Sequence, residues 1–294
     1  MKRKFLALLA VAVLGVTAFT GCGNSEAQAA EGGFNTSRGI TVVSREDGSG
    51  TRTAFIEITG VQARDADGNN RDFTTLDAEI ANGTSLVIGS VAGNEYAMGY
   101  ISLGSLNDNV RAINVNGAAP TSANVQSGAY PLFRTFYVSV QNDLDSATQS
   151  FIDFMLSQEG QAVVSGNYIP VSANAPAFAG ENPGGTIVVA GSTSVAPLME
   201  RLREAYIAIN PNVNIEINVQ GTSAGIQASI NGTAQIGMSS RALNATELES
   251  VNAIAIAYDG LAVIVNNANP LADITTEEIR QIFVGELTRW NEIN

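Results

Sequence analysis

Residues 44–52 read Ser-Arg-Glu-Asp-Gly-Ser-Gly-Thr-Arg. They follow the apolar run 40–43, Ile-Thr-Val-Val, and precede the helical pattern 54–58, Ala-Phe-Ile-Glu-Ile. A strand that ends in a glycine- and serine-rich turn and opens into a helix places hydroxyls and backbone N–H groups at a helix N-terminus. The first-turn donors there have no partner within the helix, and the helix dipole is positive. Arg45 adds a planar fork of donors that suits the oxygens of a phosphate-like group. The stretch therefore predicts one half of a binding site for an oxyanion.

The composition favours a globular protein of about two domains. The chain has 294 residues, of which 45% are apolar, with 29 glycines and 8 prolines. Its net charge of −13 argues against binding of nucleic acid through a basic face, so an anion has to be held by local donors. The chain has no histidine and one cysteine, which excludes Ser-His-Asp and Cys-His catalysis, Cys/His zinc sites and a disulfide within the chain. A carboxylate metal site remains formally possible, but no metal and no cofactor is predicted.

The N-terminus has the pattern of an export signal. A basic start at residues 1–4 precedes an apolar run from Phe5 to Phe19, which is short for a membrane span. The sequence Phe-Thr-Gly-Cys at 19–22 resembles a bacterial lipobox, so residues 1–21 are predicted to be a signal peptide and Cys22 to carry lipid. Residues 22–38 then contain the lipidated Cys22 and a flexible tether. The alternative is a plain signal peptide with an incidental cysteine.

Strands and helices are predicted to alternate, which indicates α/β layers. Short apolar or β-branched runs predict strands at 40–43, 86–88, 97–103, 110–115, 132–140, 186–190, 214–219 and 234–238. Residues 253–265 are mostly apolar, interrupted by Tyr-Asp-Gly at 258–260. Helical spacing predicts helices from 54, at 74–81 and 146–165, and after the turns at 191–194, 221–225 and 275. Ser194 is expected to cap its helix, and Thr275 with Glu278 forms a capping box. Residues 120–130 are expected to be a loop and 172–185 a linker.

Four turns carry Ser, Thr and Gly at predicted helix starts, namely 48–51, 191–194, 221–225 and 238–241. Any one of them is most often a simple helix cap, and an arginine such as Arg45 most often pairs with a neighbouring carboxylate, here Glu46 or Asp47. The same device after several strands favours a shared site, because ligands of α/β sheets bind outside the C-terminal ends of the strands. No Walker sequence and no GxGxxG is present, so a nucleotide site is a poor fit.

Five segments together carry a family resemblance: 44–52, 99–106 (Gly-Tyr-Ile-Ser-Leu-Gly-Ser-Leu), 191–198 (Gly-Ser-Thr-Ser-Val-Ala-Pro-Leu), 236–241 (Ile-Gly-Met-Ser-Ser-Arg) and 257–263 (Ala-Tyr-Asp-Gly-Leu-Ala-Val). Residues 39–294 resemble the phosphate-binding component of the phosphate ABC transporter. The resemblance implies a lipid-anchored protein on the extracytoplasmic face of the cell membrane, which binds inorganic phosphate and delivers it to an ABC permease for import. Two alternatives are a binding protein for another tetrahedral oxyanion and a phosphate-sensing module that is not coupled to transport. A phosphatase is disfavoured, because no histidine or evident metal cluster would activate Ser49 or Ser194 as a nucleophile.

The order of the segments differs from that of the family. There the 191–198 segment lies near the mature N-terminus and the Arg45 loop follows the segment around Trp290, so this chain resembles a circular permutation cut between Asn294 and Gly39. Residues 173–185 would join the usual termini. The implied fold is α/β, a two-lobed periplasmic-binding-protein fold of type II with hinge crossovers near 131–138 and 259–265. One lobe would comprise 39–134 plus 266–294, and the other 135–265.

The resemblance also implies roles for individual residues around the phosphate. Arg45 would make the charged contact, with Asp47 orienting it. Hydroxyl and backbone N–H donors would come from both lobes, at Ser49, Gly50, Thr51, Ser194, Val195 and Ser223. Ser240 takes the position where some family members have an Asp that accepts the proton of hydrogen phosphate and so rejects sulfate. Selectivity against sulfate therefore does not follow from the resemblance.

Overall fold

Residues 33–294 are described by a computed structural model, so the predicted signal peptide 1–21 and Cys22 lie outside the described residues. The decisive stretch folds as its pattern predicts. Strand β1 (Thr41–Arg45) runs into a turn, and helix α1 (Gly50–Thr59) begins behind the N-cap Ser49. None of the described helices is long and apolar enough to cross a membrane.

Two long antiparallel strands, β8 (Phe133–Val140) and β13 (Asn252–Val265), form the centre of the main sheet. On one side of them follow β12 (Ile236–Ser239), β10 (Gly185–Ser192) and β11 (Val213–Gln220), with β10 parallel to both of its neighbours. On the other side follow β5 (Ala97–Ser102), β1 and β4 (Glu79–Ala81), with β1 parallel to both of its neighbours. The short strands β6 (Arg111–Ala112) and β9 (Ile169–Pro170) also pair with β13. Two small sheets join β7 (Asn114–Val115) to β14 (Asp273–Ile274) and β2 (Gln62–Arg64) to β3 (Asn70–Asp72).

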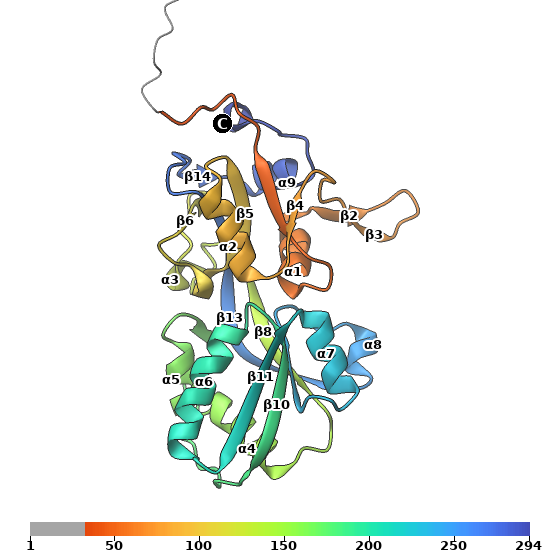
Figure 1. Cartoon of the computed structure of the whole chain (residues 1–294), viewed down its shortest axis with the longest axis vertical. Coiled ribbons are helices and arrows are strands. Elements are labelled where there is room, and N and C mark those ends of the chain that lie inside the picture. The colour runs from red at the N-terminus through yellow and green to blue at the C-terminus, as the bar shows by residue number, and fades with distance from the viewer. Residues whose placement is uncertain (1–32) are drawn as a thin grey trace, which may run out of the picture. The chain divides into compact units, whose positions relative to one another are not determined.

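Helices cover the two ends of this sheet as separate groups, as Figure 1 shows. Around β1 and β5 lie α1, α2 (Thr84–Gly93), α3 (Ser122–Gln126), the 3₁₀ turn η1 (Leu103–Ser105), α9 (Thr276–Phe283) and η2 (Trp290–Glu292). Around β10 and β12 lie α4 (Ser146–Leu156), α5 (Gln158–Val164), α6 (Ala196–Ile209), α7 (Thr222–Ile230) and α8 (Ala245–Leu248). We call the first group the first lobe and the second group the second lobe.

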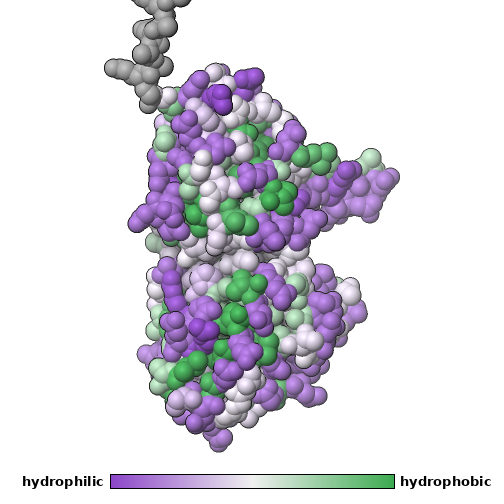
Figure 2. Space-filling model, viewed as in Figure 1, coloured by the Kyte–Doolittle hydropathy of each residue, from purple (hydrophilic) through white to green (hydrophobic). Residues whose placement is uncertain are grey.

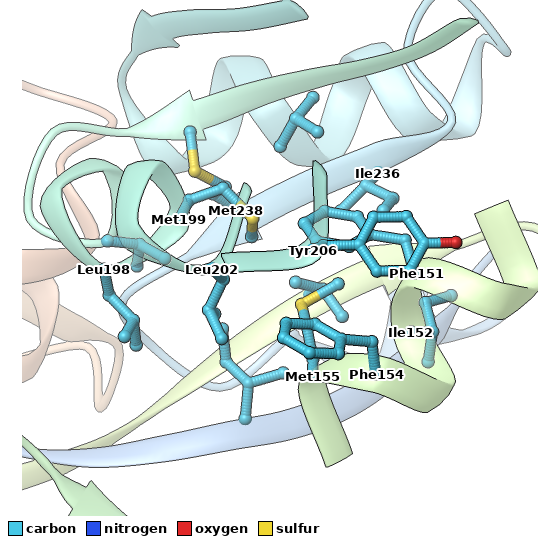
Figure 3. Packing of buried hydrophobic residues seen from close by; sticks show 14 of the residues in the cluster. Phe151, Ile152, Phe154, Met155, Leu198, Met199, Leu202, Tyr206, Ile236 and Met238 are labelled. Atoms are coloured by element: carbon cyan, nitrogen blue, oxygen red, sulfur yellow. The ribbon is translucent and has the colours of Figure 1, made fainter. Parts of the chain in front are cut away.

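The hydrophobic core is divided in the same way. The second lobe buries a large cluster drawn from residues 136–257, in which the rings of Phe151, Phe154 and Tyr206 pack close to β12 (Figure 3), and a small cluster of Ile226, Leu243 and Val251. The first lobe buries two clusters drawn from residues 42–132 and 261–290, apart from Ile169. Both groups of clusters include residues of β13, which continues from one lobe into the other (Figure 1).

The two segments at the ends of the described chain lie side by side. Ile40 N donates to Thr288 O at 2.8 Å, and Asn291 N donates to Thr36 O at 2.8 Å. Gly39 forms an isolated antiparallel bridge with Arg289. In Figure 1 the red start of the described chain accordingly lies next to the blue C-terminal end, both at the first lobe.

The predictions for residues 74–93 are wrong. Residues 74–81 were expected to form a helix and 86–88 a strand, whereas β4 occupies 79–81 and helix α2 occupies 84–93. The branched side chains of Val87 and Val91 are completely buried in α2, which packs on β5 so closely that a Cβ on Gly99 would lie 2.9 Å from Val87 Cγ1. Tertiary packing has overridden the strand propensity of the Leu-Val-Ile run.

Three other predicted elements also differ in detail. The helix predicted at 146–165 is broken at Ser157, whose hydroxyl accepts from Gly160 N at 3.2 Å and so caps a second helix, α5. The loop predicted at 120–130 contains the short α3, and 110–115 gives two strands of two residues. Residues 172–184 contain no helix or strand, as expected of a linker, but Phe178 packs against the second-lobe core.

Candidate anion-binding site

The N-terminus of α1 has the geometry and the charge of an anion-binding site. Gly48 takes the left-handed conformation, with φ of 80°, that the turn after β1 requires. Ser49 Oγ caps the helix by accepting from Arg52 N at 3.3 Å. The N–H groups of Gly50 and Thr51, in the first turn, have no acceptor within the helix. The first turn of α1 contains no acidic residue that would neutralise the positive end of the helix dipole.

Arg45 is buried beside this helix, with 1% of its surface exposed. Its Nε and Nη2 atoms each lie 2.7 Å from an oxygen of Glu46, in a bidentate pair. Nη2 also donates to Thr193 Oγ1 at 3.0 Å, which brings the side chain into contact with the second lobe. Burial alone would raise the pKa of Glu46, but the hydrogen bonds and charge of Arg45 outweigh this effect and lower that pKa below its ordinary value.

The predicted role of Asp47 is therefore corrected. Its side chain is 99% exposed and pairs with Arg52, at 3.1 Å, instead of with Arg45. Asp47 lies at the outside of the turn, whereas the longer side chain of Glu46 folds back over the guanidinium and also accepts from Gly83 N at 3.1 Å. Glu46 orients Arg45.

Six hydroxyl side chains meet next to Arg45, and we call them the hydroxyl cluster: Thr51, Thr84, Thr193, Ser194, Thr222 and Ser240. Thr51 Oγ1 lies 2.7 Å from Ser194 Oγ and 3.5 Å from Ser240 Oγ. Thr84 Oγ1 lies 3.3 Å from Ser194 Oγ and 3.2 Å from Thr193 Oγ1, and Thr222 Oγ1 lies 3.2 Å from Ser240 Oγ.

The hydroxyl cluster joins the two lobes. Thr51 and Thr84 belong to the first lobe, and the other members belong to the second. All of them are buried except the half-buried Thr193. Since a hydroxyl can donate one hydrogen bond and accept two, the cluster can adapt to either protonation state of a bound oxyanion.

Gly50 allows the hydroxyls of the second lobe to approach the α1 N-terminus. A Cβ at this position would lie 2.5 Å from Thr222 Oγ1 and 2.8 Å from Ser240 Oγ, distances at which atoms cannot coexist. The backbone of Gly50 is not in the left-handed region, so the close approach, and not the helix geometry, is what requires glycine here.

The prediction that Ser194 caps α6 is wrong. The structure places Val195, not Ser194, at the N-cap, with no side-chain cap. The hydroxyl of Ser194 is thereby free to face Thr51. The N–H of Val195 donates to Ser192 O at 3.2 Å within the turn, and its side chain is buried.

Two predicted hydroxyl residues lie outside the hydroxyl cluster: Ser49, which caps α1, and Ser223. Ser223 is exposed, its Oγ accepts from Arg241 Nη2 at 3.3 Å, and its N–H donates to Gly48 O at 3.1 Å across the lobes. The cluster takes the preceding residue, Thr222, instead. Successive residues of a helix point in directions about 100° apart, so a difference of one position decides which hydroxyl is turned inward.

Glu46, Thr84, Thr193 and Thr222 are site residues that sequence reasoning missed. Thr193 and Thr222 lie within turns that had been singled out, next to the residues chosen from them. Thr84 was hidden by the wrong strand prediction, since it opens α2 directly after β4. A glycine followed by a hydroxyl residue at a helix start, as at 83–84, is the signal that could have identified it.

A groove of about 350 Å³ lies beside part of the hydroxyl cluster. Thr84 and Thr193 lie in its wall, together with Leu86 of α2 and Val219 of β11. These two apolar side chains come from different lobes and are 57% and 53% exposed. Figure 2 shows hydrophobic surface on both lobes in this view. Among residues 33–294 there is no group of three or more acidic or cysteine residues that could hold a metal ion.

Comparisons with known proteins show the family to which the chain belongs. A sequence profile described as the PBP superfamily domain matches residues 25–159 and 176–294. The chain is 40% identical over 297 residues to the phosphate-binding protein PstS 2 of Streptococcus agalactiae, covering 100% of this chain and 99% of that protein. It is 42% identical over 293 residues to PstS 2 of Streptococcus pneumoniae, covering 99% of each. A crystal structure of the phosphate-binding protein of a phosphate ABC transporter from S. pneumoniae TIGR4 matches with a TM-score of 0.70 at 43% identity, covering 87% of this chain and 100% of that one.

Proposed function

Because the chain belongs to the PBP superfamily and, within it, to the phosphate-binding proteins PstS of phosphate ABC transporters, we propose that it binds inorganic phosphate between its two lobes and delivers it to an ABC permease. The observation that carries this proposal is the buried guanidinium of Arg45 beside the open N-terminus of α1, with hydroxyls from both lobes around it. A tetrahedral oxyanion is the ligand that such converging donors fit.

The charge balance of the site favours an anion bound mainly by hydrogen bonds. The positive charge of Arg45 is already paired with Glu46, and the chain as a whole carries a net charge of −13. Attraction over long range therefore contributes little, and the short-range donors of the hydroxyl cluster and the α1 N-terminus supply the binding free energy. Closure of the two lobes around the anion would complete this set of donors, because the cluster draws on both lobes.

A site for more than one tetrahedral oxyanion is the second candidate, and Ser240 favours it. No carboxylate belongs to the hydroxyl cluster, and that of Glu46 is engaged by Arg45. Sulfate has no proton to donate, so a carboxylate acceptor would repel it, whereas hydroxyls can turn to donate to it. We therefore expect weaker discrimination against sulfate than a site with an Asp at position 240 would have.

Binding, and not catalysis, is the activity we propose. The relatives that cover the chain end to end are named as binding proteins. The two serines that a phosphatase could use have other tasks, since Ser49 caps α1 and Ser194 bonds to Thr51. The chain contains no histidine to act as their base.

We further propose that the protein is exported and held on the extracytoplasmic face of the membrane by lipid on Cys22. The support is the basic and apolar N-terminal pattern followed by the lipobox-like residues 19–22. The circularly permuted order is also a proposal. It is supported by the pairing of residues 34–40 with 288–291, because segments that lie side by side can be joined or cut with little effect on the fold.

A competition titration of the purified protein tests the ligand. Phosphate is expected to bind with a heat that saturates at one anion per chain, and sulfate is expected to displace it at higher concentration. Ser240→Asp should strengthen the preference for phosphate over sulfate, with Ser146→Asp at the exposed start of α4 as a control outside the site. A protein that binds neither anion would refute the proposal, and equal rejection of sulfate by the wild type and Ser240→Asp would refute the role given to Ser240.

A further inference from the structure

A buried ion pair lies in the two strands that connect the lobes. Arg134 of β8 stands directly opposite Asp259 of β13 in the antiparallel register. Their side chains are 3% and 1% exposed. Asp259 Oδ2 accepts from Arg134 Nε at 3.2 Å and from Nη2 at 3.1 Å, so the carboxylate oxygen holds two arms of the guanidinium.

The remaining contacts of this pair extend into both lobes. On the first-lobe side, Asp259 Oδ1 accepts from Ser102 Oγ at 2.8 Å and from Gly104 N at 3.4 Å. On the second-lobe side, Arg134 Nη1 donates to Ser240 O at 3.3 Å. One network therefore links the end of β5, the two connecting strands and a residue of the hydroxyl cluster.

Stability alone does not account for the pair. The cost of removing two charges from water roughly cancels their attraction inside a protein, and apolar replacements of such pairs are often neutral or stabilising. What the pair does provide is a fixed orientation. The guanidinium of Arg134 is held by Asp259 on one side and lies 5.0 Å from the centre of the Phe136 ring.

Ser240 is the residue that this orientation affects. Its carbonyl accepts from Arg134, and its N–H donates to Thr222 Oγ1 at 3.2 Å. Both backbone groups of Ser240 are thus fixed, and its hydroxyl is directed to Thr222 and Thr51. The pKa of Arg134 is lowered chiefly by burial, against the effect of Asp259, and the positive charge of Arg45 lowers it further, which agrees with a location close to the anion site.

We propose that Arg134 and Asp259 are positioning residues that fix the backbone of Ser240 relative to the two connecting strands, so that the hydroxyl cluster is correctly assembled when the lobes meet. The effect on phosphate affinity rests on the proposed function, whereas the effect on the backbone of Ser240 does not. Neither residue contacts the anion itself in this proposal.

The test uses the double variant Arg134→Met with Asp259→Asn. Either substitution alone is unsuitable, because it leaves a buried charge without its partner and destabilises the fold. The double variant removes both charges, and Asn keeps an acceptor oxygen for Ser102 and Gly104. We expect a cooperatively folded protein whose phosphate affinity is at least tenfold weaker. The surface pair of α9, in which Arg280 is half-buried and Glu277 exposed, is changed as Arg280→Met with Glu277→Gln; this control should bind as the wild type does.

A merely structural role is distinguished by combining the double variant with Ser240→Ala. If the pair acts by placing the Ser240 hydroxyl, removing the pair costs little further affinity in a protein that already lacks this hydroxyl. The losses of affinity from the two changes are then not additive. Fully additive losses, or wild-type affinity in a folded double variant, would overturn the proposal.

Hydrogen exchange separates this proposal from the function on which its affinity readout rests. In the ligand-free protein the amide of Ser240, which is protected by Thr222, should exchange faster in the double variant than in the wild type. A wild type that fails to bind phosphate would refute the proposed function, but faster exchange at Ser240 would still support the positioning role. An unchanged exchange rate at Ser240 in the double variant would overturn the positioning role, whichever anion the protein binds.

Discussion

The substitution Gly50→Ala is expected to stabilise helix α1 but to hinder the close approach of the two lobes. In an isolated helix the change is favourable, because alanine has a higher helix propensity than glycine. In the assembled site the new Cβ would lie 2.5 Å from Thr222 Oγ1 and 2.8 Å from Ser240 Oγ. Ordinary contacts begin near 3.4 Å, so either the lobes separate by about 1 Å or the Thr222 side chain turns away.

Both adjustments disrupt the hydroxyl cluster. A shift of about 1 Å breaks the contacts of Ser194 with Thr51 and Thr84, and rotation of Thr222 removes its contacts with Oγ and N of Ser240, so that each adjustment loses two contacts. A hydrogen bond contributes about 0.5–1.5 kcal/mol net, so the loss of two contacts weakens phosphate binding by about 1–3 kcal/mol. This corresponds to about 5- to 150-fold in Kd.

The assay is calorimetric titration with phosphate, combined with thermal unfolding of the ligand-free protein. Gly50→Ala should bind more weakly while its unfolding temperature is unchanged or higher. Gly89→Ala is the matched control, since Gly89 also lies in a helix but a Cβ there would meet nothing within 4 Å. It should gain up to about 1 kcal/mol of stability and bind phosphate as the wild type does. Wild-type affinity of Gly50→Ala would refute the close approach of the lobes on which the site depends.

Three further predictions follow from the same geometry. Thr222→Val should weaken phosphate binding about tenfold or more, whereas Ser223→Ala, one residue further on, should change it little; the opposite order in a titration would restore Ser223 to the site. Because the pKa of Glu46 is lowered from its ordinary value of 4.5, its ionised form stabilises the fold above that pH, and this contribution is lost as the pH falls through the lower folded-state pKa. Glu46→Gln should therefore show a smaller acid-induced loss of stability in denaturant titrations than the wild type; equal losses would contradict this. A chain in which Asn294 is joined to Phe34 by a short linker and opened between residues 173 and 175 should fold cooperatively and bind phosphate, as measured by circular dichroism and calorimetry, and failure to fold would contradict the proposed permutation.

Local chemistry made much of this protein predictable from its sequence. The turn after β1 could be identified because a glycine, a serine and a helical pattern follow one another within a few residues. In the structure this glycine has a positive φ and the serine is the N-cap. The same reasoning identified the turns that contain Ser194 and Ser240. Parallel strands bring their C-terminal ends to one edge, so turns far apart in the sequence could be expected to meet.

What could not be predicted depends on tertiary packing and on side-chain direction. The apolar run 86–88 is compatible with a strand or a buried helix, and only its packing on β5 decides between them. The choice between Glu46 and Asp47, or between Thr222 and Ser223, requires knowing which of two adjacent residues faces inward. The pairing of Arg134 with Asp259 follows from the register of two strands that are more than a hundred residues apart, which no local pattern contains.

The most direct test of the central claim is calorimetric titration of Arg45→Ala with phosphate, beside the wild type. Among the described residues, Arg45 provides the one buried guanidinium that donates to side-chain hydroxyls of the hydroxyl cluster, and hydrogen bonds to a charged group contribute about 1.5–3 kcal/mol each. The variant should therefore bind phosphate at least tenfold more weakly, while Arg280→Ala on the surface of α9 should not differ from the wild type. A folded Arg45→Ala protein with unchanged phosphate affinity would contradict the assignment of the anion to this site.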